Sequence, residues 1–273
     1  MDCLVSDLSE YQAAFLKTYF CPQLFAVVSW GCAATAWLAR TLNHHPDIFC
    51  VHAANHGWQV LGNCDRLDGL PYMRVLGNMG ADHLAAGDVH GVSRHHVHEL
   101  KQILGKHFNS AVVVREPVGR LRSQLALFAK FQKYRTWDIG YIESIIPRKR
   151  VVLPADTYEC RFFVHAANML NAILEEKSVG RIFRSEDLTK WPECLGDFVE
   201  DITGGEVSPN MEWLRSAIAR PRLNIHRHQP ARQPFENWQL DVIQKVVEPE
   251  SWEIYETLGY PPWQQELESQ ICA

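Results

Sequence analysis

The stretch LFAVVSWGCAATAWLARTLNHH, residues 24–45, decides the fold of this chain. Its first part, 24–29, is a short apolar and β-branched run, which predicts a strand buried on both faces of a parallel sheet. From Trp37 to Leu42 apolar side chains recur at helical spacing, and Pro46 prevents the helix from continuing. The stretch therefore predicts a strand, a tight turn and a helix.

The same order of elements recurs further along the chain. The run SAVVV, residues 110–114, predicts a second strand, and apolar side chains follow it at helical spacing from Leu121 to Phe128. Residues 162–175 predict a helix, and 180–183 predict a short strand. These alternating elements predict one α/β domain over 1–273, in three layers, with a mostly parallel sheet flanked by helices.

Two segments are harder to interpret. Ser185, Glu186 and Asp187 are typical of a helix start, so we expect one helix from there to Phe198. Residues 64–97 hold many Gly and His residues with weak periodicity, and we expect loops and short helices around a site.

Composition narrows the classes of function. The 273 residues are 47% hydrophobic with a net charge of −5, and this acidic balance argues against a nucleic-acid-binding surface. Any anion-binding site must therefore be confined to a small part of the surface. No apolar stretch reaches the roughly 18 residues that a membrane span needs. The eight cysteines are scattered, with no CxxC pair, so we expect reduced thiols and a cytoplasmic location.

The turn after the first strand is a candidate phosphate cradle. In open α/β sheets ligands bind beyond the carboxyl ends of the strands, where backbone N–H groups and helix N-termini favour anions. Thr35 would add a hydroxyl donor to the main-chain donors of Gly31, Cys32, Ala33, Ala34 and Ala36. A tight turn without a ligand is the alternative, because the glycine and lysine spacing of a P-loop is missing.

Four segments in order resemble the sulfotransferase superfamily. VVSWGCAATAWLARTLNHHPDIF resembles its 5′-phosphosulfate loop, and VVVREPVGRLRSQLALF is similar to its 3′-phosphate element. FRSEDL is similar to its acidic strand-to-helix junction, and residues 235–260 resemble the C-terminal helices of bacterial members. The resemblance implies a sulfotransferase fold, which is P-loop NTPase-like. It also implies 3′-phosphoadenosine 5′-phosphosulfate as the donor, with Arg115 and Ser123 on its 3′-phosphate.

One departure from the family concerns the loop cation. Most members place a Lys or Arg where this chain has Cys32, and a neutral thiol does not stabilise charge on a leaving phosphate. Members close the nucleotide site with a late basic loop, so the resemblance favours Arg227 and Arg232 as substitutes. Arg120 and Arg122 share the helix of Ser123 and are further candidates, whereas a solvated charged loop is the plain alternative.

Sulfuryl transfer needs a base that removes the proton of the acceptor hydroxyl, and histidine suits that role. The resemblance favours His90, 25 residues before Arg115, and then His52, which takes the place of a Glu in carbohydrate-acting members. The cluster His95, His96 and His98 lacks a metal-binding pattern, and we expect a helix surface and no metal site.

The sequence thus predicts a sulfotransferase that acts on a hydroxyl of a carbohydrate, lipid or small metabolite. The alternative is a non-catalytic member that retains nucleotide or glycan binding, as Cys32 would suggest. A kinase or NTPase lacks its GxxxxGK[ST] loop here, and a nucleic-acid-binding module lacks a basic and aromatic stripe. The acceptor and the oligomeric state are left open.

Overall fold

A computed structural model describes residues 22–29, 33–52, 69–92, 94–134, 153–155, 157–221 and 235–265. The described residues form two compact units, unit 1 from 1–114 and 176–223 and unit 2 from 115–175 and 224–273. The prediction of one domain over 1–273 stays a prediction.

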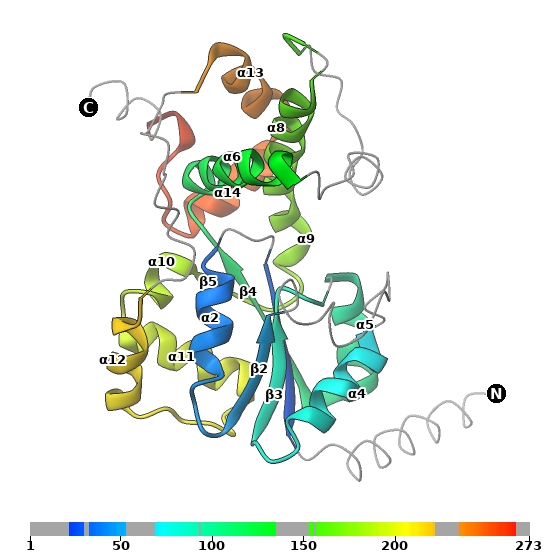
Figure 1. Ribbon diagram of the computed structural model, residues 1–273, viewed down its shortest axis with the longest axis vertical. Helices are drawn as coiled ribbons and strands as arrows, with labels where there is room; N and C mark the ends of the chain where they lie inside the picture. Colours follow the sequence, from blue (N-terminus) through cyan, green and yellow to red (C-terminus); the bar gives the residue numbers. More distant parts are fainter. Residues whose placement is uncertain are drawn as a thin grey trace, which may run out of the picture. The chain divides into compact units, whose positions relative to one another are not determined.

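The elements follow one another in an alternating order (Figure 1). They are β1 (Gln23–Val28), α2 (Thr35–Leu42), β2 (Ile48–His52), α4 (Gly69–Met79), β3 (Ala85–Val89), α5 (Arg94–Leu104), η2 (Gly105–His107), β4 (Phe108–Val114), α6 (Pro117–Tyr134), α8 (Tyr158–Asn168), η3 (Met169–Ala172), α9 (Ile173–Glu176), β5 (Arg181–Arg184), α10 (Ser185–Leu188), α11 (Pro192–Thr203), α12 (Met211–Ala219), α13 (Asn237–Val246) and α14 (Pro249–Thr257).

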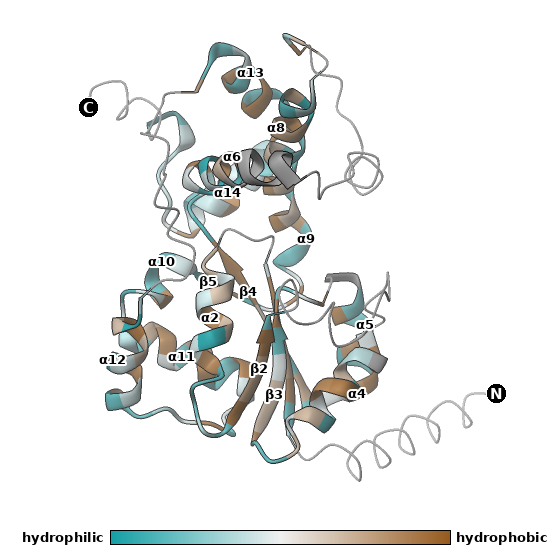
Figure 2. Ribbon diagram, in the orientation of Figure 1, coloured by the Kyte–Doolittle hydropathy of each residue, from teal (hydrophilic) through white to brown (hydrophobic). Residues whose placement is uncertain are grey.

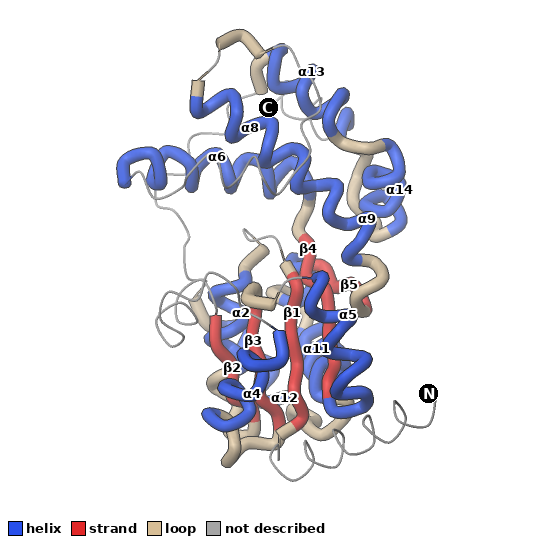
Figure 3. Tube along the Cα trace, turned by 90° about the vertical axis from the view of Figure 1, so that its right-hand side faces the viewer, coloured by secondary structure: helices blue, strands red, loops and turns tan. Residues whose placement is uncertain are grey.

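Unit 1 is built on a parallel sheet. Within the described residues the sheet has five strands in the order β2-β3-β1-β4-β5, and every neighbouring pair is parallel. The strands appear side by side in Figure 3 and are mostly apolar in Figure 2. Strands that are covered on both faces need such apolar runs, because neither face meets water. The predicted α/β class with a parallel sheet is confirmed.

The helices of unit 1 cover both faces of this sheet (Figure 1). α2 packs against β2 and β3, and α11 packs against β1 and β4 and carries α12. α4 packs against β3, and α5 against β4, on the opposite face. The three-layer arrangement that the sequence predicts is therefore present in unit 1.

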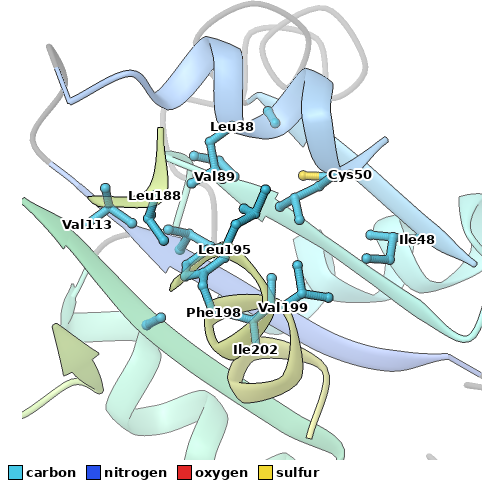
Figure 4. Packing of buried hydrophobic residues seen from close by; sticks show 14 of the residues in the cluster. Leu38, Ile48, Cys50, Val89, Val113, Leu188, Leu195, Phe198, Val199 and Ile202 are labelled. Carbon is cyan, nitrogen blue, oxygen red and sulfur yellow. The ribbon is translucent and has the colours of Figure 1, made fainter. Parts of the chain in front are cut away.

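The hydrophobic core of unit 1 lies beneath α2 and α11 (Figure 4). Phe198 of α11 is fully buried and meets the Phe183 ring edge-to-face at 5.1 Å between centroids. Leu195 and Val199 of the same helix are fully buried with it and belong to the same apolar cluster as Val113 of β4. Full burial of one such side chain contributes roughly 1.5–3 kcal/mol, so α11 holds this face of the sheet largely through apolar packing.

The expectation for residues 64–97 was wrong where the structure describes them. This region holds two helices, α4 and α5, and β3, a central strand that pairs with β1 and β2. The sequence pattern did not predict β3 because this strand contains Gly87, and glycine is depleted in strands. Its small size is required there, since a Cβ would lie 2.1 Å from the Phe25 carbonyl oxygen.

The single helix expected from Ser185 to Phe198 was also wrong. The chain forms α10 and then begins α11 at Pro192. Trp191 is extended, with φ −114° and ψ 116°, because a following proline disfavours the helical conformation. Pro192 then starts the new helix, where its missing N–H has no cost.

Unit 2 is helical in its described part. Phe163 of α8 meets Phe235 and Trp238 edge-to-face at 5.8 and 5.3 Å between ring centroids. Asn171 accepts hydrogen bonds from the Glu248 N–H at 2.7 Å and the Ser251 hydroxyl at 3.0 Å, which fixes the start of α14. These contacts tie the C-terminal helices to α8 and η3.

Candidate functional site

The carboxyl edge of the sheet has a switch point at β1 and β3. The chain leaves β1 for α2 on one face and leaves β3 for α5 on the other. Open α/β sheets bind ligands at such points. Thr35 and the start of α2, which the sequence predicts to be part of a phosphate cradle, follow β1 and lie at this position.

The described part of this loop begins with buried Ala33 and continues into α2. Ala34 is the N-cap in the left-handed conformation, with φ 58°, and has no side-chain oxygen to cap the helix. Thr35 is buried and is the first residue of α2, followed by Ala36. The helix thus starts without an acidic residue in its first turn, which suits an anion at its N-terminus.

Three of the residues predicted from the sequence meet at this edge. Thr35 Oγ1 and His52 Nε2 lie 3.0 Å apart in a buried hydrogen bond. The rings of His52 and His90 are 5.8 Å apart between centroids, with an angle of 39° between their planes. The structure therefore places the helix start, the end of β2 and the end of β3 around one polar cluster.

The ring orientation of His90 is fixed by a backbone contact. Its Nδ1 hydrogen-bonds the carbonyl oxygen of Ser29, the residue that follows β1. A carbonyl only accepts, so Nδ1 carries the proton and the neutral ring has its lone pair on Nε2. A histidine in this tautomer can take a proton through Nε2.

A buried acid beside this cluster was missed in the sequence. Asp88 of β3 is fully buried, and the Tyr72 hydroxyl of α4 donates to its Oδ2 at 3.0 Å. Burial raises the pKa of Asp88 to about 7, and the hydrogen bond from Tyr72 opposes part of this increase. The sequence feature that could have identified Asp88 is a single acidic residue inside an apolar stretch, two residues before His90.

The predicted 3′-phosphate residues lie in unit 2, on either side of the start of α6. Arg115 is half-buried just before the helix, and Ser123 is half-buried two turns along it. The Glu116 carboxylate accepts from the Val118 N–H at 2.7 Å and from the Gly119 N–H. Because Glu116 already uses these donors, a phosphate here would depend on the side chains of Arg115 and Ser123.

Two other arginines of α6 have different surroundings. Arg120 is buried, and burial and then its charge lower the pKa of His165 to about 4. Arg122 lies over the Phe235 ring, 5.3 Å from its centroid. Arg120 thus belongs to the interior of unit 2, beside a histidine that is neutral at pH 7.

Four of the predicted binding residues, Gly31, Cys32, Arg227 and Arg232, lie outside the described residues. In α2 the only basic residue is Arg40, in the last turn, so the first turn of this helix supplies no cation. His98 of α5 is exposed, as expected for a helix surface. Within the described part of the chain, no group of three or more His, Cys, Asp or Glu residues is arranged to hold a metal ion.

Comparisons with known proteins find a similarity in structure and none in sequence. No family model matches the chain, and no curated protein matches it. The chain is similar to a solved sulfotransferase domain from the curacin biosynthetic pathway, with 13% sequence identity and a TM-score of 0.43. The match covers 88% of this chain and 98% of that domain. Among the described helices, none is long and apolar enough to cross a membrane.

Proposed function

We propose that this protein is a sulfotransferase that uses 3′-phosphoadenosine 5′-phosphosulfate to sulfate a hydroxyl of a carbohydrate, lipid or small metabolite. The observation that supports this most is the cluster of Thr35, His52 and His90 at the switch point. It combines an anion-favouring helix start with a base in a defined tautomer.

The two ends of the donor would have different partners. The backbone donors at the start of α2 and the Thr35 hydroxyl suit the 5′-phosphosulfate. The guanidinium of Arg115 and the hydroxyl of Ser123 suit the 3′-phosphate, because both donate hydrogen bonds and a guanidinium pairs with phosphate in a bidentate manner.

The proposed reaction assigns the proton to His90. As the acceptor oxygen forms a bond to sulfur, its proton passes to His90 Nε2, and the bond between sulfur and the bridging oxygen breaks. The products are a sulfate ester and 3′-phosphoadenosine 5′-phosphate. His52 holds Thr35 and lies beside His90, so its role is to position the loop and the base.

A second function is favoured by the missing cation. Cys32 replaces the family's loop Lys or Arg, and the first turn of α2 offers no other basic residue. On this hypothesis the protein binds the nucleotide, or a glycan, without transferring sulfate. Transfer of labelled sulfate from the donor to a panel of phenols and sugars distinguishes the two functions.

The first experiment is calorimetric titration with 3′-phosphoadenosine 5′-phosphate in metal-free buffer. We expect binding by the wild type and a loss of about tenfold or more in Arg115→Ala, since a charge-assisted hydrogen bond contributes about 1.5–3 kcal/mol. Arg215→Ala, which removes an exposed arginine of α12, is the matched control and should bind like the wild type. Failure of the wild type to bind would overturn the donor assignment.

A second variant tests the base. His90→Asn should retain nucleotide binding and lose transfer by about 10²-fold or more, the usual contribution of a general base. If transfer is detected and His90→Asn keeps the wild-type rate, another group is the base.

A further inference from the structure

The start of α2 offers hydrogen-bond donors to an anion but no positive side chain. The only basic residue of α2 is Arg40, in its last turn. Sites that bind and transfer phosphate-like groups stabilise the negative charge with fixed positive groups. The proposed function therefore needs a positive charge that a neighbouring element supplies.

His52, the last residue of β2, is a titratable group in direct contact with this helix start. Its Nε2 lies 3.0 Å from Thr35 Oγ1, and the residue is only 8% exposed. The fold fixes this pairing, because α2 packs against β2. A protonated His52 would thus be separated by one side chain from an anion at the N-terminus of α2.

The hydroxyl of Thr35 links such an anion to the protonation of His52. A threonine hydroxyl has one hydrogen to donate and can accept through its lone pairs. If Thr35 donates that hydrogen to an anion, Oγ1 acts as the acceptor towards His52. His52 Nε2 must then carry a proton, because the two atoms share a hydrogen bond.

A buried hydroxyl at the end of β1 indicates that a ligand completes this cluster. Ser29 Oγ is buried and has no hydrogen-bond partner in the part of the chain that the structure describes. The carbonyl of the same residue accepts from His90 Nδ1, so Ser29 belongs to the cluster. Buried polar groups are nearly always hydrogen-bonded, and the oxygens of a bound anion would accept from this hydroxyl.

The titratable groups near His52 favour a single positive charge there. The His90 ring is 5.8 Å away between centroids, so protonation of both rings is disfavoured by repulsion. Cys50, on the same face of β2, is neutral because burial raises the pKa of its thiol. Asp88 of β3 bonds to α4 on the other face of the sheet, and its pKa of about 7 makes it a second group that titrates near neutral pH.

We propose that His52, protonated when the nucleotide binds, supplies the positive charge that Cys32 does not supply in the loop. His52 Nε2–H donates to Thr35 Oγ1, and the Thr35 hydroxyl donates to the 5′-phosphate or phosphosulfate. The proton comes from solvent as the nucleotide binds, while His90 stays neutral and keeps its Nε2 lone pair for the acceptor hydroxyl. The inference rests on the proposed function for its ligand.

The test is calorimetric titration with 3′-phosphoadenosine 5′-phosphate at pH 6 and pH 8. Histidines titrate near pH 6.5 when unperturbed, so an imidazolium is more costly to form at pH 8 than at pH 6. From pH 8 to pH 6, the affinity of the wild type divided by that of His52→Gln should rise about tenfold, the effect of one charge-assisted hydrogen bond. The ratio removes the ionisation of the ligand itself, whose phosphates titrate at about pH 6 with both proteins.

Two controls separate His52 from other titratable groups. His98→Gln makes the same change at an exposed histidine of α5 and should follow the wild type at both pH values. Asp88→Asn removes the other group that titrates near pH 7 and should keep the rise in affinity. Thr35→Val removes the linking hydroxyl and should lose the rise, whereas Thr35→Ser should keep it. These two variants decide the matter if His52→Gln does not fold.

The possible failures are distinguishable. If His52→Gln, or Thr35→Val when it alone folds, shows the same pH dependence as the wild type, the inference is overturned and the donor assignment stands. If the rise is lost in Asp88→Asn and kept in His52→Gln, the buried acid is its source and the inference is again overturned. Wild-type protein that does not bind the nucleotide at either pH would overturn the proposed function together with the inference.

Discussion

The two faces of the sheet carry different polar pairs at the same edge. On the α2 face, Thr35 and His52 form a hydrogen bond of 3.0 Å beside an extensive apolar core. On the α4 face, Tyr72 donates to a fully buried carboxylate, Asp88, also at 3.0 Å. Both pairs join a helix to the end of a strand, yet only the second places a carboxylic acid in the interior.

The two faces of the sheet therefore depend on different interactions. The α2 face needs only packing and a neutral hydrogen bond to hold the start of its helix, which leaves that helix end suited to an anion. The α4 face holds an acid whose charged form is disfavoured by burial and stabilised by the hydrogen bond from Tyr72. We therefore expect the α2 face to respond to changes in volume and the α4 face to respond to pH.

The largest effect should come from Phe198→Ala on the α2 face. Phe198 is fully buried against Phe183, and its truncation leaves a cavity, so the free energy of unfolding should fall by about 3–5 kcal/mol. Urea denaturation measures this loss. Leu84→Ala, at a leucine that is 49% exposed, should change stability by about 0.5 kcal/mol or less. If the two variants lose similar amounts of unfolding free energy, apolar packing of Phe198 is not what stabilises the α2 face.

The next effect is the pH dependence of the α4 face. The pKa of Asp88 is raised by burial from 3.8 to about 7, so the folded protein binds more protons there than the unfolded chain. Stability from this group is thus fully present below pH 4 and is lost as the pH rises towards 7, by at most about 4 kcal/mol. Cys50 and Tyr72, whose pKa values are raised by burial, stay neutral in this window.

Urea denaturation of the wild type and of Asp88→Asn between pH 4 and 8 measures that dependence. The stability of the wild type relative to the variant should decline as the pH rises, because the asparagine does not titrate. A difference that is constant with pH would show that the Asp88 pKa is close to its ordinary value.

The sequence predicted the elements that continuous apolar runs define. Residues 24–29 and 110–114 fall on β1 and β4, because strands buried on both faces need such runs. It missed β3, since Gly87 and Asp88 have low strand propensity and only tertiary pairing with β1 and β2 makes them a strand. It also joined α10 and α11, because Ser185 resembles a helix start more clearly than Pro192 does.

The candidate site was predicted in part. Thr35 was chosen because it follows a predicted strand, and His52 and His90 were chosen on family resemblance. The structure brings all three to one edge. Asp88 and Tyr72 were not chosen, because the pair depends on α4 packing against β3, a contact between residues 16 apart that no local pattern records. Whether Arg115 and Ser123 bind phosphate stays a prediction.

The smallest effects should come from deleting one hydroxyl on each face. Tyr72→Phe removes a donor to a carboxylate, which contributes about 1.5–3 kcal/mol at pH 8, whereas Thr35→Val removes a neutral hydrogen bond that contributes about 1 kcal/mol. Below pH 5 the Asp88 carboxyl is protonated, so the cost of Tyr72→Phe should fall to about that of Thr35→Val. Urea denaturation of both variants at pH 5 and pH 8 measures this. If the loss in Tyr72→Phe does not grow with pH, the Tyr72 hydroxyl is not what holds the charge of Asp88.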